Sequence, residues 1–271
     1  MAEIVANGIR LEYDVIGEGD PLLLVAGRGM PRSWWTEEHV RPYLDAGYRV
    51  ILFDNRGMPP SDCPEEPFTI ADLVSDTAAL IDGLDLGRSV VVGYSMGSCI
   101  AQELAVVRPD LVRAVALVAT LARHPGWLDA FHRGALELFA TAVSVPAEFW
   151  VAMLIGQVYT PDELANDDAV LPTLEALVAG PQWEDPGRRG QWAAYAAYEG
   201  RVSELSRVEA PSLVIAFERD LIMPPVRARE VADAIPNCRY VEVARVGHWG
   251  LLLQPRDVHA TVLRFLDGAM R

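Results

Sequence analysis

The chain has 271 residues, of which 51% are hydrophobic, and its 38 acidic and 23 basic residues leave a formal charge of −15. This length and apolar content suit one folded domain with an insertion and argue against intrinsic disorder. The acidic balance argues against nucleic acid or an anionic membrane surface as a partner, because both repel a negative protein.

The beginning of the chain predicts a β-hairpin over residues 3–16, because Asn7-Gly8 is a strong turn signal and the following residues alternate. A helix is predicted after Thr69, which forms an approximate capping box with Asp72. Helical segments separate most of the further predicted strands, so we expect a mostly parallel sheet with helices on both faces. Those strands lie near 21–26, 49–54, 89–94, 112–119, 212–217 and 239–243.

The most informative motif is the pentapeptide Gly93-Tyr94-Ser95-Met96-Gly97, which lies between a β-branched run and a helix-like stretch. Strand, G-x-S-x-G and helix in this order are typical of a nucleophile elbow. The glycines on both sides allow strand and helix to approach closely, and the serine takes a strained backbone conformation. We therefore expect an exposed Ser95 hydroxyl at a helix N-terminus, where negative charge is stabilised.

An interval without a convincing strand, residues 122–202, interrupts the alternation of strands and helices. Helices are predicted there near 128–143, 147–156, 161–178 and 188–200. The interval precedes the strand near 212–217, so we expect it over the carboxyl ends of the strands, where ligands bind in open sheets. It is dense in aromatic residues: Trp127, Phe131, Phe139, Phe149, Trp150, Tyr159, Trp183, Trp192, Tyr195 and Tyr198.

A subset of aromatic side chains is predicted to line a substrate pocket under these helices, because such a cap excludes water from a reaction. Packing inside the interval itself remains the alternative for any single ring. The side chains that we assign to the pocket are Trp127, Phe131, Trp150, Trp192 and, from outside the interval, Trp249.

A serine nucleophile needs a base, and the base needs an acid that orients it. Asp220 follows the predicted strand near 212–217, and His248 lies in a glycine-flanked turn after the strand near 239–243. Ser95, Asp220 and His248 therefore each follow a strand, with Glu218 as the rival acid. Of the other histidines, His39 and His259 are predicted to lie at the surface, and His124 and His132 fall in the interval, where they could contact substrate.

This order of residues resembles the α/β-hydrolase family over nearly the whole chain. Residues 22–27 resemble its third strand and oxyanion loop, residues 54–62 its D-x-R-G-x-G-x-S-D turn, and residues 247–249 its catalytic-histidine loop. The resemblance implies a mostly parallel, roughly eight-stranded α/β sheet with helices on both faces and an inserted helical cap. The core would comprise residues 1–121 and 203–271, and the cap residues 122–202.

The resemblance also implies roles for two backbone amides. Met96 N–H and, from the loop after the third strand, Arg28 N–H would form the oxyanion hole. This chain has Ala26-Gly27 where the family often has His-Gly, which leaves the support of that loop open. The Arg28 side chain could pair with a substrate carboxylate or polar oxygen, or it could reach solvent.

These features predict a serine hydrolase that cleaves an ester, lactone or thioester of a small, largely apolar substrate through an acyl-enzyme. A carbon–carbon hydrolase, a perhydrolase or a natural-product cyclase could use the same triad, and a non-catalytic ligand-binding receptor could use the same scaffold. Serine at the elbow argues against an epoxide hydrolase or haloalkane dehalogenase, which need an aspartate there. No metal or organic cofactor is expected, because no ligand spacing and no glycine-rich phosphate loop occurs.

The expected partner is a small-molecule substrate, with no nucleic acid and no membrane, and a homodimer is kept open. No apolar run reaches the roughly 18 residues of a membrane span. The odd number of cysteines (Cys63, Cys99 and Cys238) and the lack of a signal peptide favour a reducing, cytoplasmic location. Cys99 is expected to be a packed small residue rather than a second nucleophile.

Overall fold

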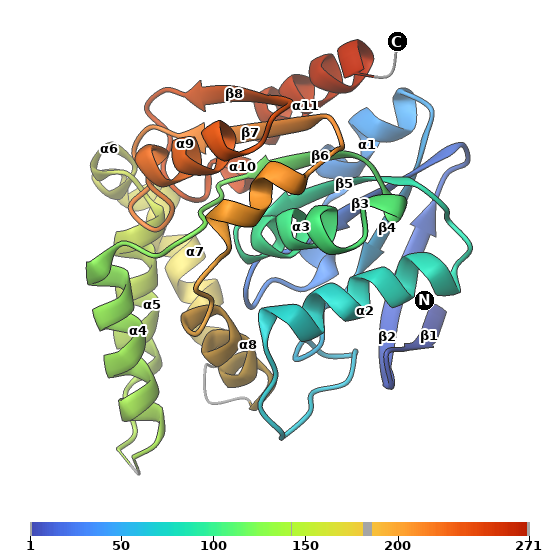
Figure 1. The fold of residues 1–271 in the computed structure, drawn as a ribbon. Helices are drawn as coiled ribbons and strands as arrows, with labels where there is room; N and C mark the ends of the chain where they lie inside the picture. The colour runs from blue at the N-terminus through green and yellow to red at the C-terminus, as the bar shows by residue number, and fades with distance from the viewer. Residues whose placement is uncertain (1, 142, 181–185, 270–271) are drawn as a thin grey trace.

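The computed structural model describes residues 2–141, 143–180 and 186–269, and it is built around one eight-stranded sheet (Figure 1). The strand order is β1-β2-β4-β3-β5-β6-β7-β8. β1 and β2 form the predicted antiparallel hairpin, β2 also pairs antiparallel with β4, and all later pairs are parallel. The mostly parallel α/β sheet is therefore confirmed. The strands are β1 (Ala2–Ala6), β2 (Ile9–Ile16), β3 (Asp20–Val25), β4 (Tyr48–Phe53), β5 (Ser89–Tyr94), β6 (Val112–Val118), β7 (Ser212–Phe217) and β8 (Cys238–Val243).

Helices cover both faces of the sheet. α1 and α11 pack together on one face, and α2 and α3 pack together on the other, where α9 also covers β7 and β8 (Figure 1). The predicted capping box of Thr69 and Asp72 is present at the start of α2. These helices are α1 (Glu37–Asp45), α2 (Ile70–Gly83), α3 (Met96–Val107), α9 (Pro225–Ala234), α10 (Gly250–Leu253) and α11 (Pro255–Ala269).

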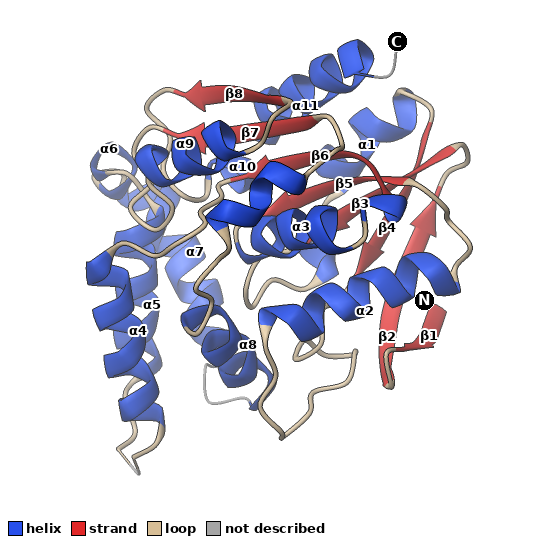
Figure 2. Ribbon diagram, in the orientation of Figure 1, coloured by secondary structure: helices blue, strands red, loops and turns tan. Residues whose placement is uncertain are grey.

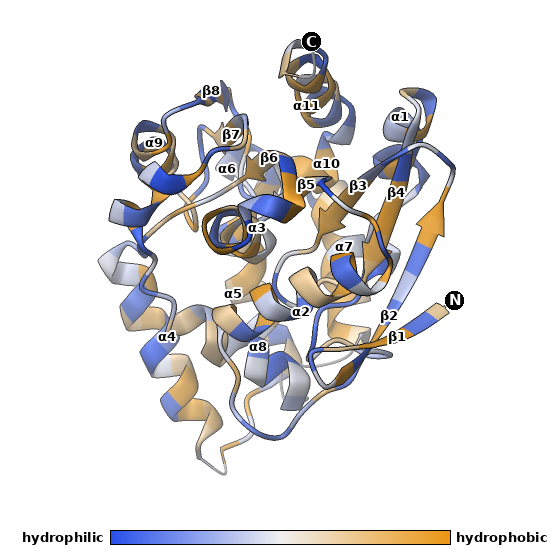
Figure 3. Cartoon of the chain, turned by 45° about the vertical axis from the view of Figure 1, so that its right-hand side comes forward, coloured by the Kyte–Doolittle hydropathy of each residue, from blue (hydrophilic) through white to orange (hydrophobic). Residues whose placement is uncertain are grey.

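The core lies along the central strands. Every residue of β5 and of β7 is buried, as expected for parallel strands that are covered on both faces. The edge strand β8 instead contains only partly buried and exposed residues. Figure 3 shows strands in the hydrophobic colour inside the molecule, whereas α4 carries hydrophilic and hydrophobic residues side by side.

The segment between β6 and β7 forms a group of helices beside the carboxyl ends of β6–β8 (Figure 2). The single helix predicted over 161–178 is two helices, because Thr160 and Glu163 cap a short α6 and Asn166 leaves the helical conformation before α7. Trp183 lies outside the described residues. The helices are α4 (Gly126–Phe139), α5 (Ala147–Val158), α6 (Pro161–Leu164), α7 (Asp167–Ala179) and α8 (Pro186–Ala196).

The two ends of this segment meet above α3. Gly200 has a φ of +54°, and a Cβ there would lie 1.6 Å from the Ala122 carbonyl oxygen, so only glycine fits. The buried carboxylate of Glu103 on α3 accepts hydrogen bonds from the Tyr198 hydroxyl at 2.9 Å and from Arg201 Nε at 2.9 Å. The entry and exit of the helical segment are thereby tied to the helix that follows Ser95.

The prediction that His39 and His259 lie at the surface is wrong. Both are buried where α1 packs against α11, and Tyr43 Oη lies 2.8 Å from His259 Nδ1. Burial lowers the pKa of His39 to about 4 and that of His259 to about 3, so both imidazoles are neutral. Among the described helices, none combines the length with the apolar run that crossing a membrane requires.

Candidate active site

Ser95 stands at the sharp turn between β5 and α3. Its φ of 55° and ψ of −123° are unusual for a residue with a side chain, and such strain is common at functional sites. A Cβ at Gly93 would lie 2.3 Å from the Gly97 carbonyl oxygen, and one at Gly97 would lie 2.1 Å from that of Val25. Both glycines are therefore required by the close packing of strand, turn and helix, as the pentapeptide predicts.

Three side chains from three strand ends form one hydrogen-bonded chain. Ser95 Oγ lies 2.9 Å from His248 Nε2, and His248 Nδ1 lies 2.7 Å from Asp220 Oδ2. The other carboxylate oxygen of Asp220 accepts hydrogen bonds from the backbone N–H groups of Ile222 at 2.9 Å and Met223 at 2.8 Å. Asp220 and His248 are only 2% and 4% exposed, so this carboxylate is held in a dry, ordered position against the imidazole.

The rival residues take other roles. The exposed Glu218 accepts a hydrogen bond from the backbone N–H of Arg245, while Asp220 is the carboxylate that contacts His248. Cys99 is fully buried on α3, and burial raises the pKa of its thiol to about 12. A thiol of that pKa stays protonated at neutral pH, so it is a poor nucleophile.

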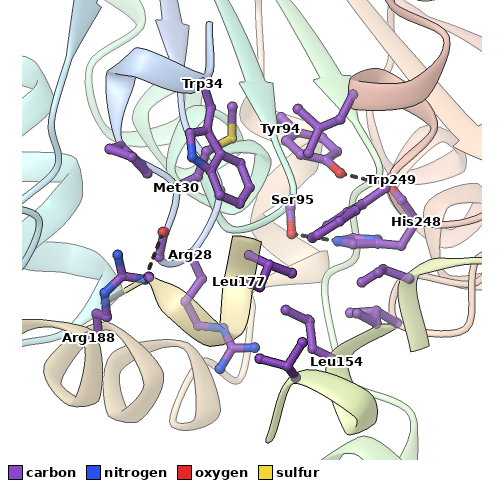
Figure 4. A pocket seen from close by; sticks show the side chains of 18 of the residues that line it. Arg28, Met30, Trp34, Tyr94, Ser95, Leu154, Leu177, Arg188, His248 and Trp249 are labelled. Carbon is purple, nitrogen blue, oxygen red and sulfur yellow. Dashed lines mark hydrogen bonds between the residues drawn. The ribbon is translucent and has the colours of Figure 1, made fainter. Parts of the chain in front are cut away.

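Tyr94, which the sequence analysis does not assign to the site, holds the histidine loop in place. Its hydroxyl donates to the His248 carbonyl oxygen at 2.8 Å, and its ring stacks on the imidazole with the centroids 5.7 Å apart (Figure 4). Tyr94 is the variable residue before Ser95 in the pentapeptide, a position that the motif leaves undefined. The one available signal was that this position holds a tyrosine, whose ring can stack and whose hydroxyl can donate a hydrogen bond.

The loop after β3 carries the predicted amide of Arg28 and is braced by α8. Gly29 N–H donates to Gln191 Oε1 at 2.8 Å, and Gln191 Nε2 donates to the Arg56 carbonyl oxygen at 2.8 Å. Arg188 Nη1 also donates to the Gly29 carbonyl oxygen, at 3.2 Å. Gln191 is fully buried, and it supplies support for a loop that lacks the usual histidine. No sequence motif singles out Gln191.

The second predicted amide belongs to Met96, the first residue of α3. Its N–H is among the first amides of the helix, which have no acceptor within the helix. The N–H of Ser95 itself donates to the Val118 carbonyl oxygen at 3.0 Å. The first turn of α3 thus presents Met96 beside the serine and keeps the Ser95 amide bound to the sheet.

A cavity of about 340 Å³ lies over Ser95 and His248, between the core and the inserted helices (Figure 4). Most of its wall is apolar, which suits a small substrate with a large hydrophobic part. Among its described lining residues are Arg28, Met30, Trp34, Tyr94, Ser95, Leu154, Leu177, Arg188, Tyr195, His248 and Trp249.

Of the side chains predicted to contact substrate, Arg28 and Trp249 line this cavity, and the other four do not. Trp127 is 45% exposed on the outside of α4. Phe131, Trp150 and Trp192 pack on one another, with Trp192 5.7 Å from Phe131 and 6.1 Å from Trp150, measured between ring centroids. They border a recess of only about 10 Å³, so their rings serve the packing of the inserted helices.

Comparison with known proteins places the chain among enzymes. The sequence model described as alpha/beta hydrolase fold matches residues 20–255. A relative from Mycobacterium tuberculosis named "Putative non-heme bromoperoxidase BpoC" is 38% identical over 257 residues, which cover 95% of this chain and 97% of the relative. Rhodomycin D methylesterase DnrP from Streptomyces peucetius is 31% identical over an alignment that covers 86% of this chain and 87% of the relative. The crystal structure of the enol-lactonase from Burkholderia xenovorans LB400 is 26% identical, covers 98% of this chain and 100% of its own, and has a TM-score of 0.84.

Proposed function

The chain belongs to the α/β-hydrolase family and is a hydrolase, and from this premise we propose that it cleaves a carboxylic ester, lactone or thioester through a covalent intermediate on Ser95. The observation that carries the proposal is the hydrogen-bonded chain from Ser95 Oγ through His248 to Asp220, with contacts of 2.9 and 2.7 Å. Nucleophile, base and orienting acid are within reach of one another before any substrate binds.

In the proposed reaction, His248 Nε2 takes the proton of the Ser95 hydroxyl as its oxygen attacks the substrate carbonyl. Asp220 holds the imidazole so that Nε2 faces the serine, and it stabilises the imidazolium that forms. His248 then passes the proton to the leaving group, and an acyl-enzyme remains. Water attacks that ester with His248 as the base, which releases the acid and restores Ser95.

The oxyanion of each tetrahedral intermediate would be bound by the backbone N–H groups of Met96 and Arg28. Met96 supports this role as the first residue of α3, where the helix dipole also favours negative charge. Arg28 supports it from the loop that Gln191 braces. Each such donor contributes about 10²–10³ to the rate in comparable sites.

The apolar cavity supports a small, largely apolar substrate, and the inserted helices would act as a cap that excludes water. The proposed division is a hydrolase core of residues 1–121 and 203–271 and a cap of residues 122–202. We also propose a reducing, cytoplasmic location. None of the three cysteines, all of which lie in the described part of the chain, is in a disulfide.

The name of the mycobacterial relative favours one second candidate, a perhydrolase. If hydrogen peroxide instead of water attacks the acyl-enzyme, the products are free Ser95 and a peracid, with no other change in the proposed machinery. Peracid-dependent oxidation of bromide in acetate buffer with hydrogen peroxide would measure this activity. The rate of hydrolysis of an ester with the same acyl group, measured without peroxide, is the reference.

The test of the hydrolase is the turnover of p-nitrophenyl acetate and butyrate by wild type and Ser95→Ala. We expect Ser95→Ala to lower kcat/KM by about 10³-fold or more and to abolish labelling by a fluorophosphonate. The control is Ser206→Ala, which changes an exposed serine and should leave both readouts unchanged. Labelling and turnover that persist in Ser95→Ala would refute the proposal.

A further inference from the structure

The charged residues in the described part of the cavity wall have the opposite sign to the net charge of the chain. Among the described residues that line it, Arg28 and Arg188 are the charged ones, and no aspartate or glutamate takes part. The chain as a whole carries 38 acidic against 23 basic residues. Basic side chains in the wall of an apolar cavity act at low dielectric, where their attraction for an anion is stronger than in water.

Arg28 reaches the part of the cavity that lies away from Ser95. Figure 4 shows its side chain running from the loop after β3 toward Leu154. Its guanidinium carbon lies 3.8 Å from the centre of the Trp192 ring, and its Nη1 is buried. Burial lowers the pKa of Arg28 to about 10, and the group therefore remains charged at neutral pH.

Tyr195 supplies a polar group next to this charge. It is 3% exposed and lines the cavity, and its ring centre is 6.0 Å from the Arg28 guanidinium carbon. Its hydroxyl is buried and has no hydrogen-bond partner among the described residues. A buried hydroxyl without a partner is costly unless a ligand or water satisfies it, so such a group in a cavity wall indicates a binding position.

The two imidazoles behind Tyr195 add no positive charge, and the Asp129 carboxylate lies beyond them, 3.1 Å from His124 Nδ1. The rings of His124 and His132 lie 4.7 and 5.4 Å from the Tyr195 ring, measured between centroids. Burial, and then the nearby Arg28, lowers the pKa of His132 to about 2, and burial is also the main cause that lowers the pKa of His124. The positive charge at this end of the cavity therefore comes from Arg28, with Tyr195 as a neutral donor beside it.

We infer that Arg28 and Tyr195 form a subsite for a carboxylate of the substrate, so that the preferred ester or lactone carries an acid group away from the scissile carbonyl. The inference rests on the proposed function of Ser95. A carboxylate accepts several hydrogen bonds and gains from a charged donor, which matches a guanidinium and a phenol side by side. Arg188, which also lines the cavity, adds positive potential from the wall.

The experiment compares substrates that differ in one charge. The acyl pair is mono-p-nitrophenyl adipate, which has a free carboxylate, and methyl p-nitrophenyl adipate, in which that carboxylate is a methyl ester. Both are followed by release of p-nitrophenolate. The alcohol pair is 6-acetoxyhexanoate and its methyl ester, followed by release of acetate. We expect wild type to prefer the carboxylate member of at least one pair by about tenfold or more in kcat/KM.

Two variants locate the preference. Arg28→Met should lower kcat/KM for the carboxylate member by about 10- to 150-fold, the range for a hydrogen bond to a charged group, and for the neutral member less than threefold. Tyr195→Phe removes only a hydroxyl that has no hydrogen-bond partner in the described part of the chain. It should lower the carboxylate rate about three- to tenfold and leave thermal stability unchanged. Arg41→Met, at an exposed arginine of α1, is the control for the loss of one positive charge.

The results separate the subsite from the proposed function. If wild type shows no carboxylate preference in either pair while Ser95→Ala abolishes turnover, the subsite is overturned and the proposed hydrolase function is still supported. Equal losses on charged and neutral members in Arg28→Met would also overturn it. A cooperative melting transition of Arg28→Met shows that the variant is folded. A preference that Arg28→Met and Tyr195→Phe both reduce would support the subsite.

Discussion

Gln191 offers the sharpest test of how the inserted helices act on the chemistry. The side chain extends from α8, is fully buried, and makes two hydrogen bonds of 2.8 Å, one from Gly29 N–H and one to the Arg56 carbonyl. Methionine has nearly the same length and volume but can make neither bond. The Gln191→Met variant therefore removes the brace and keeps the packing.

The expected loss of kcat follows from the two backbone groups that lose their hydrogen-bond partner in Gln191→Met. Gly29 N–H and the Arg56 carbonyl would each be buried without a partner, at about 1–3 kcal/mol apiece, so the loop loses about 2–6 kcal/mol of preference for its present position. Arg28, one residue before Gly29, carries the proposed oxyanion donor. We expect kcat to fall at least about tenfold, with a limit of about 10³-fold if that donor is lost completely.

The assay is the steady-state hydrolysis of p-nitrophenyl butyrate, with kcat and KM determined separately. KM should change less than threefold, because the transition state gains more from the oxyanion hole than the bound ester does. Gln191→Glu keeps an acceptor for Gly29 N–H and should recover part of kcat. Gln254→Met, at an exposed glutamine after α10, is the matched control. A folded Gln191→Met with wild-type kcat would show that the hydrogen bonds of Gln191 do not support the oxyanion loop.

Three further outcomes are expected. His248→Ala should cost nearly as much activity as Ser95→Ala, and the double variant little more, because the residues act as a unit; additive losses in kcat would contradict this. Dialysis against a chelator should leave kcat/KM unchanged, and activity restored by one specific metal after dialysis would refute a metal-free mechanism. Acid should destabilise the fold through His39 and His259. Because their pKa values are lowered in the folded state, the unfolded chain binds more protons below about pH 6.5, and stability falls as the pH drops. The loss should approach about 3 kcal/mol per imidazole near pH 4, and melting curves of His259→Asn that keep the wild-type pH slope would exclude this residue as a cause.

Local residue patterns are sufficient to predict several elements of this fold. The β-branched run, the pentapeptide around Ser95 and the helix after it specify a strand, a sharp turn and a helix, because the two glycines are required by contacts with the adjacent turn and strand. The sequence also placed Asp220 and His248 after strands. Since carboxyl ends of parallel strands meet at one edge of a sheet, residues in such positions are brought together whatever the details of packing.

Which faces of the helices are covered, and by what, depends on how distant segments pack together. His39 and His259 lie in amphipathic helices, but each is buried because α1 and α11 pack against each other, which periodicity alone does not reveal. The aromatic content of the inserted segment likewise did not distinguish the exposed Trp127 from Tyr195 in the cavity wall. Gln191 contacts Gly29 from 162 positions further along the chain. Such contacts arise from the docking of one helix on a distant loop, and no spacing of residues within either segment encodes them.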